Sequence, residues 1–278
     1  MALTATALDA IIALALAEDV GSGDVTGEAT IPPGAGCVAA ILAKQPGTVA
    51  GIGIIERVYG ALDPDVEVIP LVDDGMSIEA PPLELARLEG PARTVLAGER
   101  TALNLLGRLC GVATATRAYV DAVTGTGASI LDTRKTMPGL RELDKYAVAC
   151  GGGVNHRMGL YDAFLIKDNH LRIAGGVRPA VALARAAHPE LAITIEVEDL
   201  DQLRDALDCG VERVMLDNMA LATMRQAVDL VAGRAEVEAS GGITLANVRD
   251  VALTGVDVIS IGAITHSAPW LDVSMEVT

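Results

Sequence analysis

The second half of the chain alternates short apolar runs with longer amphipathic segments, and this alternation constrains the fold more than any other feature. Six such runs occupy residues 129–132, 164–167, 193–196, 214–217, 237–240 and 258–262. Strands that alternate with segments of helical length are typical of a parallel sheet covered by helices. A complete barrel of β-α units has eight strands. The runs therefore predict an α/β fold with an incomplete, partly open β/α barrel, unless further strands have escaped recognition.

Three glycines mark where helices of this half should end. Gly210, Gly233 and Gly255 each precede an apolar run by a few residues. Glycine adopts the left-handed conformation that closes many helices at the lowest steric cost. We therefore expect these residues to follow helix C-termini.

The first half of the chain has a different rhythm. Runs at 37–43, 48–55 and 66–72 are separated by turn-forming residues and predict a small antiparallel sheet. Residues 98–123 carry apolar residues at helical spacing, with Glu99 in the expected first turn, and predict one or two helices at a domain junction. The opening apolar segment contains Asp9 and has no basic start, which favours a first helix over a signal peptide.

The charge balance excludes some classes of function. The chain has 37 acidic and 21 basic residues, a formal charge of −16, and 2% aromatic residues. Such a chain is poorly suited to nucleic acids and anionic membranes and has few rings for base stacking. No stretch reaches the roughly 18 apolar residues of a membrane span. Any anionic ligand must therefore be met by a local basic site.

The cysteines are typical of a reducing compartment. Cys37, Cys110, Cys150 and Cys209 lie far apart and form no C-x-x-C pair. This pattern indicates neither a disulfide framework nor a zinc site. We expect reduced cysteines and a cytoplasmic protein.

Polar residues stand at or just after the ends of the predicted strands. They are Arg134, Lys135, Lys167, Asp168, Glu196, Asp217, Ser240 and Gly262. In a barrel of β-α units the carboxyl ends of the strands meet at one mouth, where the active site lies. We therefore expect these residues to share one pocket.

Positive charge is concentrated around this predicted mouth. Residues 132–172 hold seven basic and five acidic residues, a net charge of +2. Guanidinium groups bind carboxylate or phosphate through paired hydrogen bonds, and lysine adds a mobile point charge. The segment predicts a site for a ligand with several anionic groups. Surface charge on helices or loops is the alternative for Arg141, Lys145 and Arg172.

The glycines at 151–153 bring flexible backbone close to His156 and Arg157. Backbone amides and these side chains could together approach an anion. The same glycines could instead cap a helix over 140–150, and both explanations can hold.

Two carboxylates and two glycine-containing turns complete the pattern. Glu196 and Asp217 could hold Mg²⁺, which takes one or two carboxylates plus water and phosphate oxygens, although Asp217 could instead be a helix N-cap. The turns at 240–242 and 262–263 stand where barrels often bind phosphate, though serine and glycine are common in turns. Spacing alone therefore predicts an enzyme for a phosphate-bearing polyanion.

The run ILDTRKTMPGLRELDKYAVACGGGVNHRMGLYDAFLIKDNH at 130–170 closely resembles the signature of the quinolinate phosphoribosyltransferase family. Further matching segments are AEDVGSGDVT (17–26), GERTALNLL (98–106), IEVE (195–198), MLDN (215–218), SGGI (240–243) and IGAITHSAPWLDVSM (261–275). The resemblance covers nearly the whole chain. It implies an N-terminal α/β sandwich domain over 1–110, rejoined by 268–278, and a type II phosphoribosyltransferase-like barrel over 111–267.

The resemblance implies a Mg²⁺-dependent pentosyltransferase without an organic cofactor. Quinolinate and 5-phosphoribosyl 1-pyrophosphate (PRPP) would yield nicotinate mononucleotide, pyrophosphate and CO₂ in NAD biosynthesis. It further implies a homodimer, alone or within a higher oligomer, in which one subunit contributes Arg100 to the other's site.

The resemblance also assigns roles to residues. One group would surround quinolinate: Arg134, His156, Arg157, Lys167 and, across the interface, Arg100. A second group would hold the 5′-phosphate: Ser240, Gly241, Gly262 and His266. Lys135 would act in catalysis between the two substrates. Glu196 and Asp217 would act in catalysis and serve the metal and the ribose pyrophosphate.

The chain departs from the family pattern at Met137, where threonine is frequent, and at Ala149, where arginine is frequent. Neither is a predicted ligand position. Three alternatives remain: a related transferase for nicotinate, the paralogue associated with molybdate transport, and a non-catalytic phosphoribosyl-ligand sensor. The density of basic residues favours a dicarboxylate, and the joint presence of the lysine, carboxylate and Ser-Gly-Gly positions favours an enzyme.

Overall fold

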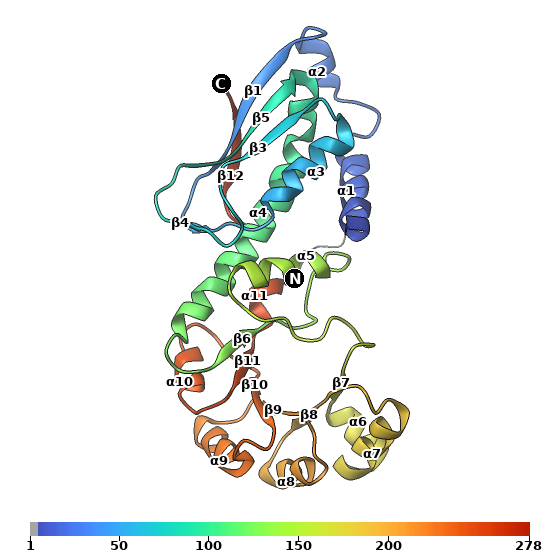
Figure 1. Cartoon of the computed structure of the whole chain (residues 1–278), viewed down its shortest axis with the longest axis vertical. Coiled ribbons are helices and arrows are strands. Elements are labelled where there is room, and N and C mark those ends of the chain that lie inside the picture. Colours follow the sequence, from blue (N-terminus) through green and yellow to red (C-terminus); the bar gives the residue numbers. More distant parts are fainter. Residues whose placement is uncertain (1–4) are drawn as a thin grey trace. The chain divides into compact units, whose positions relative to one another are not determined.

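The computed structural model describes residues 5–278 and divides into two compact units (Figure 1). Unit 1 comprises Met1–Arg117, Thr136–Gly152 and Ala263–Thr278, and unit 2 comprises Ala118–Lys135 and Gly153–Gly262. The predicted domain 1–110 begins with residues 1–4, which lie outside the described residues. Its boundary at residue 110 stays a prediction.

Unit 1 is built on an antiparallel sheet with strand order β12-β1-β5-β3. Its strands are β1 (Gly36–Ala43), β3 (Glu67–Pro70), β5 (Leu83–Pro91) and β12 (Val273–Val277), and β2 (Gly47–Thr48) pairs separately with β4 (Ser77–Ile78). Its helices are α1 (Ala5–Asp19), α2 (Val25–Thr30), α3 (Ile52–Leu62), most of α4 (Ala92–Ala122), α5 (Arg141–Cys150) and α11 (Ala263–His266). The expected antiparallel sheet is therefore present, and the C-terminal strand lies at its edge beside β1.

The predicted strand over 48–55 is wrong beyond Thr48. Gly51 adopts a left-handed conformation (φ 89°), and α3 begins at Ile52. Ile52, Ile55 and Tyr59 are buried at helical spacing, so packing against the sheet overrides the strand preference of isoleucine.

Helix α4 confirms the helix predicted over 98–123, as one helix of 31 residues. It starts six residues earlier than expected, directly after Pro91, so Glu99 is not in its first turn. Glycine inside this helix has a packing reason, because a Cβ on Gly111 would lie 2.2 Å from the Pro269 carbonyl oxygen. The small residue lets the C-terminal segment run directly against the helix.

Unit 2 is a β/α unit with one six-stranded parallel sheet of order β6-β11-β10-β9-β8-β7. The strands are β6 (Ser129–Leu131), β7 (Phe164–Ile166), β8 (Ile193–Val197), β9 (Arg213–Asp217), β10 (Glu236–Ser240) and β11 (Val258–Ser260). The helices are α6 (Asp168–Ala174), α7 (Val177–Ala187), α8 (Leu200–Asp208), α9 (Leu221–Val231) and α10 (Val248–Ala252). All six predicted strands are confirmed, and β6 and β7 form the two edges of an open sheet.

The glycines end the helices of unit 2 as predicted. Gly210, Gly233 and Gly255 have φ values of 65°, 74° and 93° and follow α8, α9 and α10. Figure 1 shows these helices along the outside of the curved sheet, which leaves the other face of the strands for the site. Within residues 5–278, no helix has the length and apolar character needed to cross a membrane.

Candidate active site

The strand register of unit 2 places four predicted site residues on one face of the sheet. Asp217 pairs with Ser240 across β9 and β10, and Glu196 pairs with Met215 across β8 and β9. Because side chains alternate along a strand, Glu196, Asp217 and Ser240 share the same face. Lys167 follows β7 directly and reaches Glu196 from the neighbouring strand. The predicted convergence at the strand ends therefore holds for these four residues.

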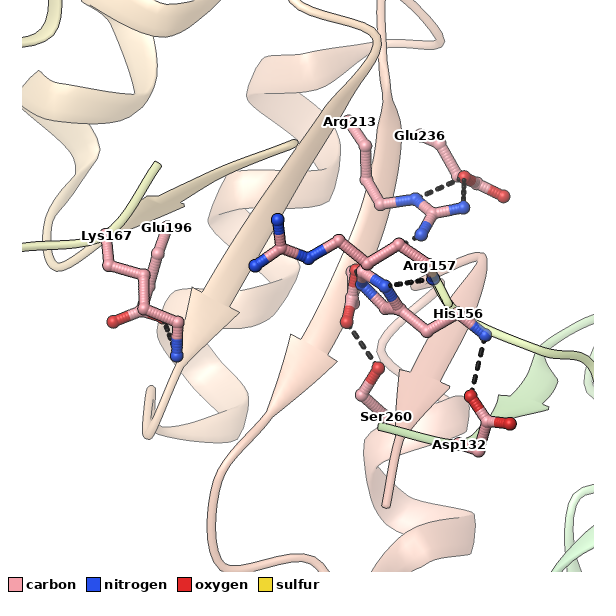
Figure 2. Close-up of polar contacts among 9 residues, drawn as sticks. Asp132, His156, Arg157, Lys167, Glu196, Arg213, Glu236 and Ser260 are labelled. Atoms are coloured by element: carbon pink, nitrogen blue, oxygen red, sulfur yellow. Dashed lines mark hydrogen bonds and ion pairs between the residues drawn. The ribbon is translucent and has the colours of Figure 1, made fainter. Parts of the chain in front are cut away.

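Lys167 and Glu196 form an ion pair with an Nζ–Oε2 distance of 3.6 Å (Figure 2). Burial raises the pKa of the Glu196 carboxyl; Lys167 opposes this rise, and the negative charge of Asp217 adds to it. His170 accepts the backbone N–H of Lys167 at Nδ1 (2.9 Å) and so fixes the start of α6. The site thus holds two neighbouring carboxylates with one lysine beside them.

Asp217 belongs to a turn that locks two strand ends together. Asn218, in a left-handed conformation, donates its backbone N–H to the Ser240 carbonyl (2.9 Å) and its Nδ2 to Asp217 (2.7 Å). A Cβ on Gly241 would lie 2.3 Å from Oδ1 of Asn218, so only glycine fits there. The N-cap alternative for Asp217 is wrong, because Ala220 caps α9.

The segment around His156 is attached to the end of β6. Val154 forms a parallel bridge with Leu131, and the buried Asp132 accepts the His156 backbone N–H at 2.8 Å. This attachment explains how a segment outside the sheet brings His156 and Arg157 to the strand ends (Figure 2).

Arg157 carries an incompletely satisfied charge. Its Nη1 donates to the Ala163 carbonyl (2.9 Å), but its Nε is buried and has no hydrogen-bond partner within residues 5–278. Burial and the nearby positive charge of Arg134 lower the pKa of Arg157, while Asp162 opposes this effect. A buried guanidinium donor with a second positive charge nearby attracts an anion.

Arg134 and Lys135 lie in the loop after β6 with exposed side chains. The Lys135 backbone N–H donates to the Thr133 hydroxyl at 3.0 Å, which shapes this loop. Gly262 follows β11 and directly precedes α11. Arg100, exposed on α4, and His266, exposed in α11, belong to unit 1, and their predicted roles stay predictions.

The surface-charge alternative has three different outcomes. It is confirmed for Arg172, which is exposed and pairs with Asp168 at 3.7 Å. It is wrong for Lys145, whose side chain is fully buried in α5 at 1% exposure. Arg141 is half-buried and donates to the Thr136 hydroxyl at 3.0 Å. Helix α5 also confirms the helix predicted over 140–150, and Gly151 caps it.

Sequence reasoning missed Glu238, which lies fully buried on the site-facing side of β10. Its carboxylate accepts the Ser260 hydroxyl and lies 3.4 Å from Nε2 of His156. The available signal was the alternation in 236–240, where polar residues occupy every second position of a strand and Val237 and Ala239 between them are buried.

Two family profiles cover nearly all of the chain. The profile described as "Quinolinate phosphoribosyl transferase, N-terminal domain" matches residues 24–110, and the profile described as "Quinolinate phosphoribosyl transferase, C-terminal domain" matches residues 112–276.

Individual relatives agree with these profiles. A probable nicotinate-nucleotide pyrophosphorylase [carboxylating] of Bacillus subtilis is 44% identical over 94% of this chain and 90% of its own length. The nicotinate-nucleotide pyrophosphorylase [carboxylating] of Mycobacterium leprae is 42% identical over 95% of this chain and 94% of its own. The solved nicotinate-nucleotide pyrophosphorylase from Francisella tularensis superimposes with a TM-score of 0.96 at 35% identity, covering 100% of this chain and 98% of its own. The α/β fold class predicted from the sequence is therefore confirmed.

Proposed function

We propose that this chain, which belongs to the quinolinate phosphoribosyltransferase family, transfers the 5-phosphoribosyl group of PRPP to quinolinate. The products are nicotinate mononucleotide, pyrophosphate and CO₂. The observation that carries this proposal is the cationic strand-end site of unit 2 inside a chain matched by both family profiles.

The dicarboxylate of quinolinate fits the basic side of the site. The Nε of Arg157 is buried and has no hydrogen-bond partner among the described residues, and Arg134 adds a second positive charge nearby. A bound carboxylate supplies the missing acceptor and relieves the repulsion between the guanidinium groups. Lys167 lies at the same strand ends, and His156 lies beside Arg157.

The carboxylates of Glu196 and Asp217 fit the metal and ribose side. The negative charge of Asp217 adds to the rise of the Glu196 pKa, so a hard cation is favoured between these carboxylates and the substrate. Within residues 5–278, no group of three or more His, Cys, Asp or Glu side chains could hold a metal. We propose that Glu196 and Asp217 would hold Mg²⁺ together with oxygens of PRPP and water. When bound, Mg²⁺ neutralises charge on the departing pyrophosphate.

In the proposed reaction the pyridine nitrogen bonds to C1′ of the ribose, and the C1′–O bond breaks with its electron pair leaving on pyrophosphate. Lys135 places a positive charge beside the charge that develops. The pyridinium ring then takes up the electron pair of the C2–carboxylate bond as CO₂ leaves, and C2 gains a proton. The protein also supplies orientation, because both substrates are held in place.

At the phosphate end, the proposed ligands of the 5′-phosphate are Ser240, Gly241, Gly262 and His266. Small residues leave backbone amides accessible to an anion. The close fit between Gly241 and Asn218 supports a rigid turn at this position.

A ¹³CO₂ release assay tests the function. Quinolinate labelled in the C2 carboxyl is incubated with PRPP and Mg²⁺, beside controls that lack PRPP or Mg²⁺. The proposal expects CO₂ and nicotinate mononucleotide in equal amounts and only in the complete mixture. Turnover of nicotinate instead of quinolinate, or ligand binding without turnover, would overturn it in favour of a related transferase or a sensor.

We further propose a cytoplasmic homodimer in which each subunit lends Arg100 to its partner's site. Four free cysteines fit a reducing compartment. Inactive Arg100→Ala and Lys135→Ala variants, mixed and reassembled, test the exchange. A hybrid dimer has one complete site and regains activity, whereas either variant reassembled alone stays inactive. No recovery in verified hybrids would contradict a shared site.

A further inference from the structure

Glu238 is a fully buried carboxylate that the proposed reaction does not use. It lies on β10 with no exposed surface. Ser260 donates its hydroxyl to Oε1, while Nη1 of Arg213 and Nε2 of His156 each lie 3.4 Å from Oε2. Burying a carboxylate is costly unless partners compensate it. Ser260, Arg213 and His156 are the partners that compensate the charge of Glu238.

The ring of His156 is fixed by a hydrogen bond at Nδ1, and its Nε2 lies 3.4 Å from Oε2 of Glu238 without forming a hydrogen bond to it. Nδ1 accepts the backbone N–H of Arg157 at 2.7 Å, and Nε2 faces Glu238. An imidazole nitrogen that accepts a hydrogen bond carries no proton, so the neutral ring must carry its proton on Nε2. The negative charge of Glu238 favours that tautomer over the alternative.

This tautomer determines the backbone position of Arg157. If the proton moved to Nδ1, it would face the Arg157 N–H, and the two donors would repel each other. The His156 backbone N–H is already engaged by Asp132 at 2.8 Å. The side chain of His156, at 8% exposure, is thus part of the support beneath Arg157.

We propose that Glu238 is a positioning residue for substrate recognition, because it holds His156 in the tautomer that places Arg157 for the ligand carboxylate. The effect passes from Glu238 through the imidazole ring to the Arg157 backbone. His156 then acts mainly by supporting Arg157, which refines the direct quinolinate contact expected from the resemblance. This proposal rests on the proposed function.

Two substitutions separate the carboxylate's roles, and a third is the control. Glu238→Leu removes the acceptor, while Glu238→Gln keeps one carbonyl acceptor without the charge. Glu236→Gln is the control. Glu236 lies on the same face of β10 as Glu238, and its carboxylate pairs with Arg213 at 2.5 Å. The proposal expects Glu238→Leu to raise the KM for quinolinate about tenfold or more, with the KM for PRPP unchanged. Glu238→Gln should fall between this variant and wild type, and Glu236→Gln should match wild type.

Imidazole ¹⁵N spectra of the free protein report the protonation of each ring nitrogen, and this readout does not depend on the stability of the fold. The chain has four histidines, so the His156 signals can be assigned by their loss in His156→Asn. Wild type should show Nε2 protonated, and both ring signals should shift in the Glu238 variants but not in Glu236→Gln. If Glu238→Leu does not fold, Glu238→Gln decides by the same spectra and KM values.

Unchanged His156 signals in the Glu238 variants, or equal losses for both substrates, would overturn the proposal. Wild-type protein without turnover would overturn the proposed function instead, and the spectra would still test the contact between Glu238 and His156.

Discussion

Arg108 in unit 1 is buried and Arg157 in unit 2 is half-buried, and their pairing differs. Arg108 donates from Nε and Nη2 to the two oxygens of Asp144 at 3.0 and 2.8 Å, and Nη2 also reaches the Thr265 carbonyl. Arg157 donates to one carbonyl, leaves Nε without an acceptor in residues 5–278 and has Arg134 as a nearby like charge.

The difference distinguishes a structural ion pair from the arginine that we propose to bind substrate. Asp144 has no exposed surface and also accepts the backbone N–H of Met137 (3.1 Å), so the pair joins α4, α5 and the loop before α5. Burial raises the pKa of Asp144 against the effect of Arg108, which illustrates the cost of withdrawing charges from water. Complete pairing offsets that cost within the protein. For Arg157, the described residues offset only part of the cost of withdrawing its charge from water, and we propose that a ligand carboxylate offsets the rest.

The largest expected effect follows from breaking the buried ion pair between Arg108 and Asp144. Asp144→Ala should lower the free energy of unfolding by about 3–5 kcal/mol, because it leaves the buried Arg108 charge without a partner. Denaturant unfolding measures this. Arg178→Ala is the matched control, because Arg178 pairs with Asp205 and Asp208 on the surface, where water screens such pairs and they contribute little to stability. Equal effects of the two substitutions would contradict the comparison.

The next effect concerns turnover instead of stability. Lys135→Ala should reduce kcat by about 10²–10³-fold, as the loss of a charge beside a developing anion does. The exposed side chain predicts an unchanged unfolding midpoint. Steady-state kinetics and thermal unfolding on the same sample check both parts. Near-normal turnover would remove Lys135 from the mechanism.

A smaller effect tests the positive charge that Arg134 adds beside Arg157. Arg134→Ala should weaken quinolinate binding by roughly 10–100-fold, the size of one hydrogen-bonded charge, with little change in PRPP binding. Calorimetric titration with each substrate measures this selectivity. Arg172→Ala, an exposed arginine paired with Asp168, serves as the control. Unchanged quinolinate affinity in Arg134→Ala would contradict the assigned role.

The smallest effect is a pH dependence of stability. Because the pKa of Glu196 is raised in the folded state, the folded protein binds more protons than the unfolded chain just above the ordinary glutamate pKa. The free energy of unfolding must then fall as the pH rises from the ordinary glutamate pKa through the raised pKa of Glu196. Glu196→Gln should be slightly more stable than wild type at pH 7, and this gain should vanish at lower pH. A stability loss at pH 7 would show that Lys167 outweighs burial.

Much of unit 2 could be predicted because its signals are local. A buried parallel strand needs an apolar run, and a helix that returns to the next strand often ends in a left-handed glycine. Unit 1 was harder to predict. The run 48–55 reads as a strand, yet Ile52 starts a helix because its apolar side packs on the sheet. Strand β5 alternates with charged residues, and no prediction covered it.

The residues of the candidate site also divide into those that local sequence patterns predicted and those that they did not. Lys167, Glu196, Asp217 and Ser240 were predictable because the ends of parallel strands converge. The role of Glu238 was not, because it depends on Ser260 and His156, each from a different part of the chain. Lys145 was misread as a possible surface charge for a similar reason, since burial in α5 depends on what packs around it.

The sequence by itself determined the alternation of strands and helices, the glycines that end the helices, and the polar residues that follow the strands. These features depend on the conformational preferences of neighbouring residues. Only the tertiary structure decided which charges are paired. Arg108 donates to both oxygens of Asp144, whereas the Nε of Arg157 has no hydrogen-bond partner in the part of the chain that the structure describes. That outcome depends on strand register and on contacts between distant segments, which no local pattern specifies.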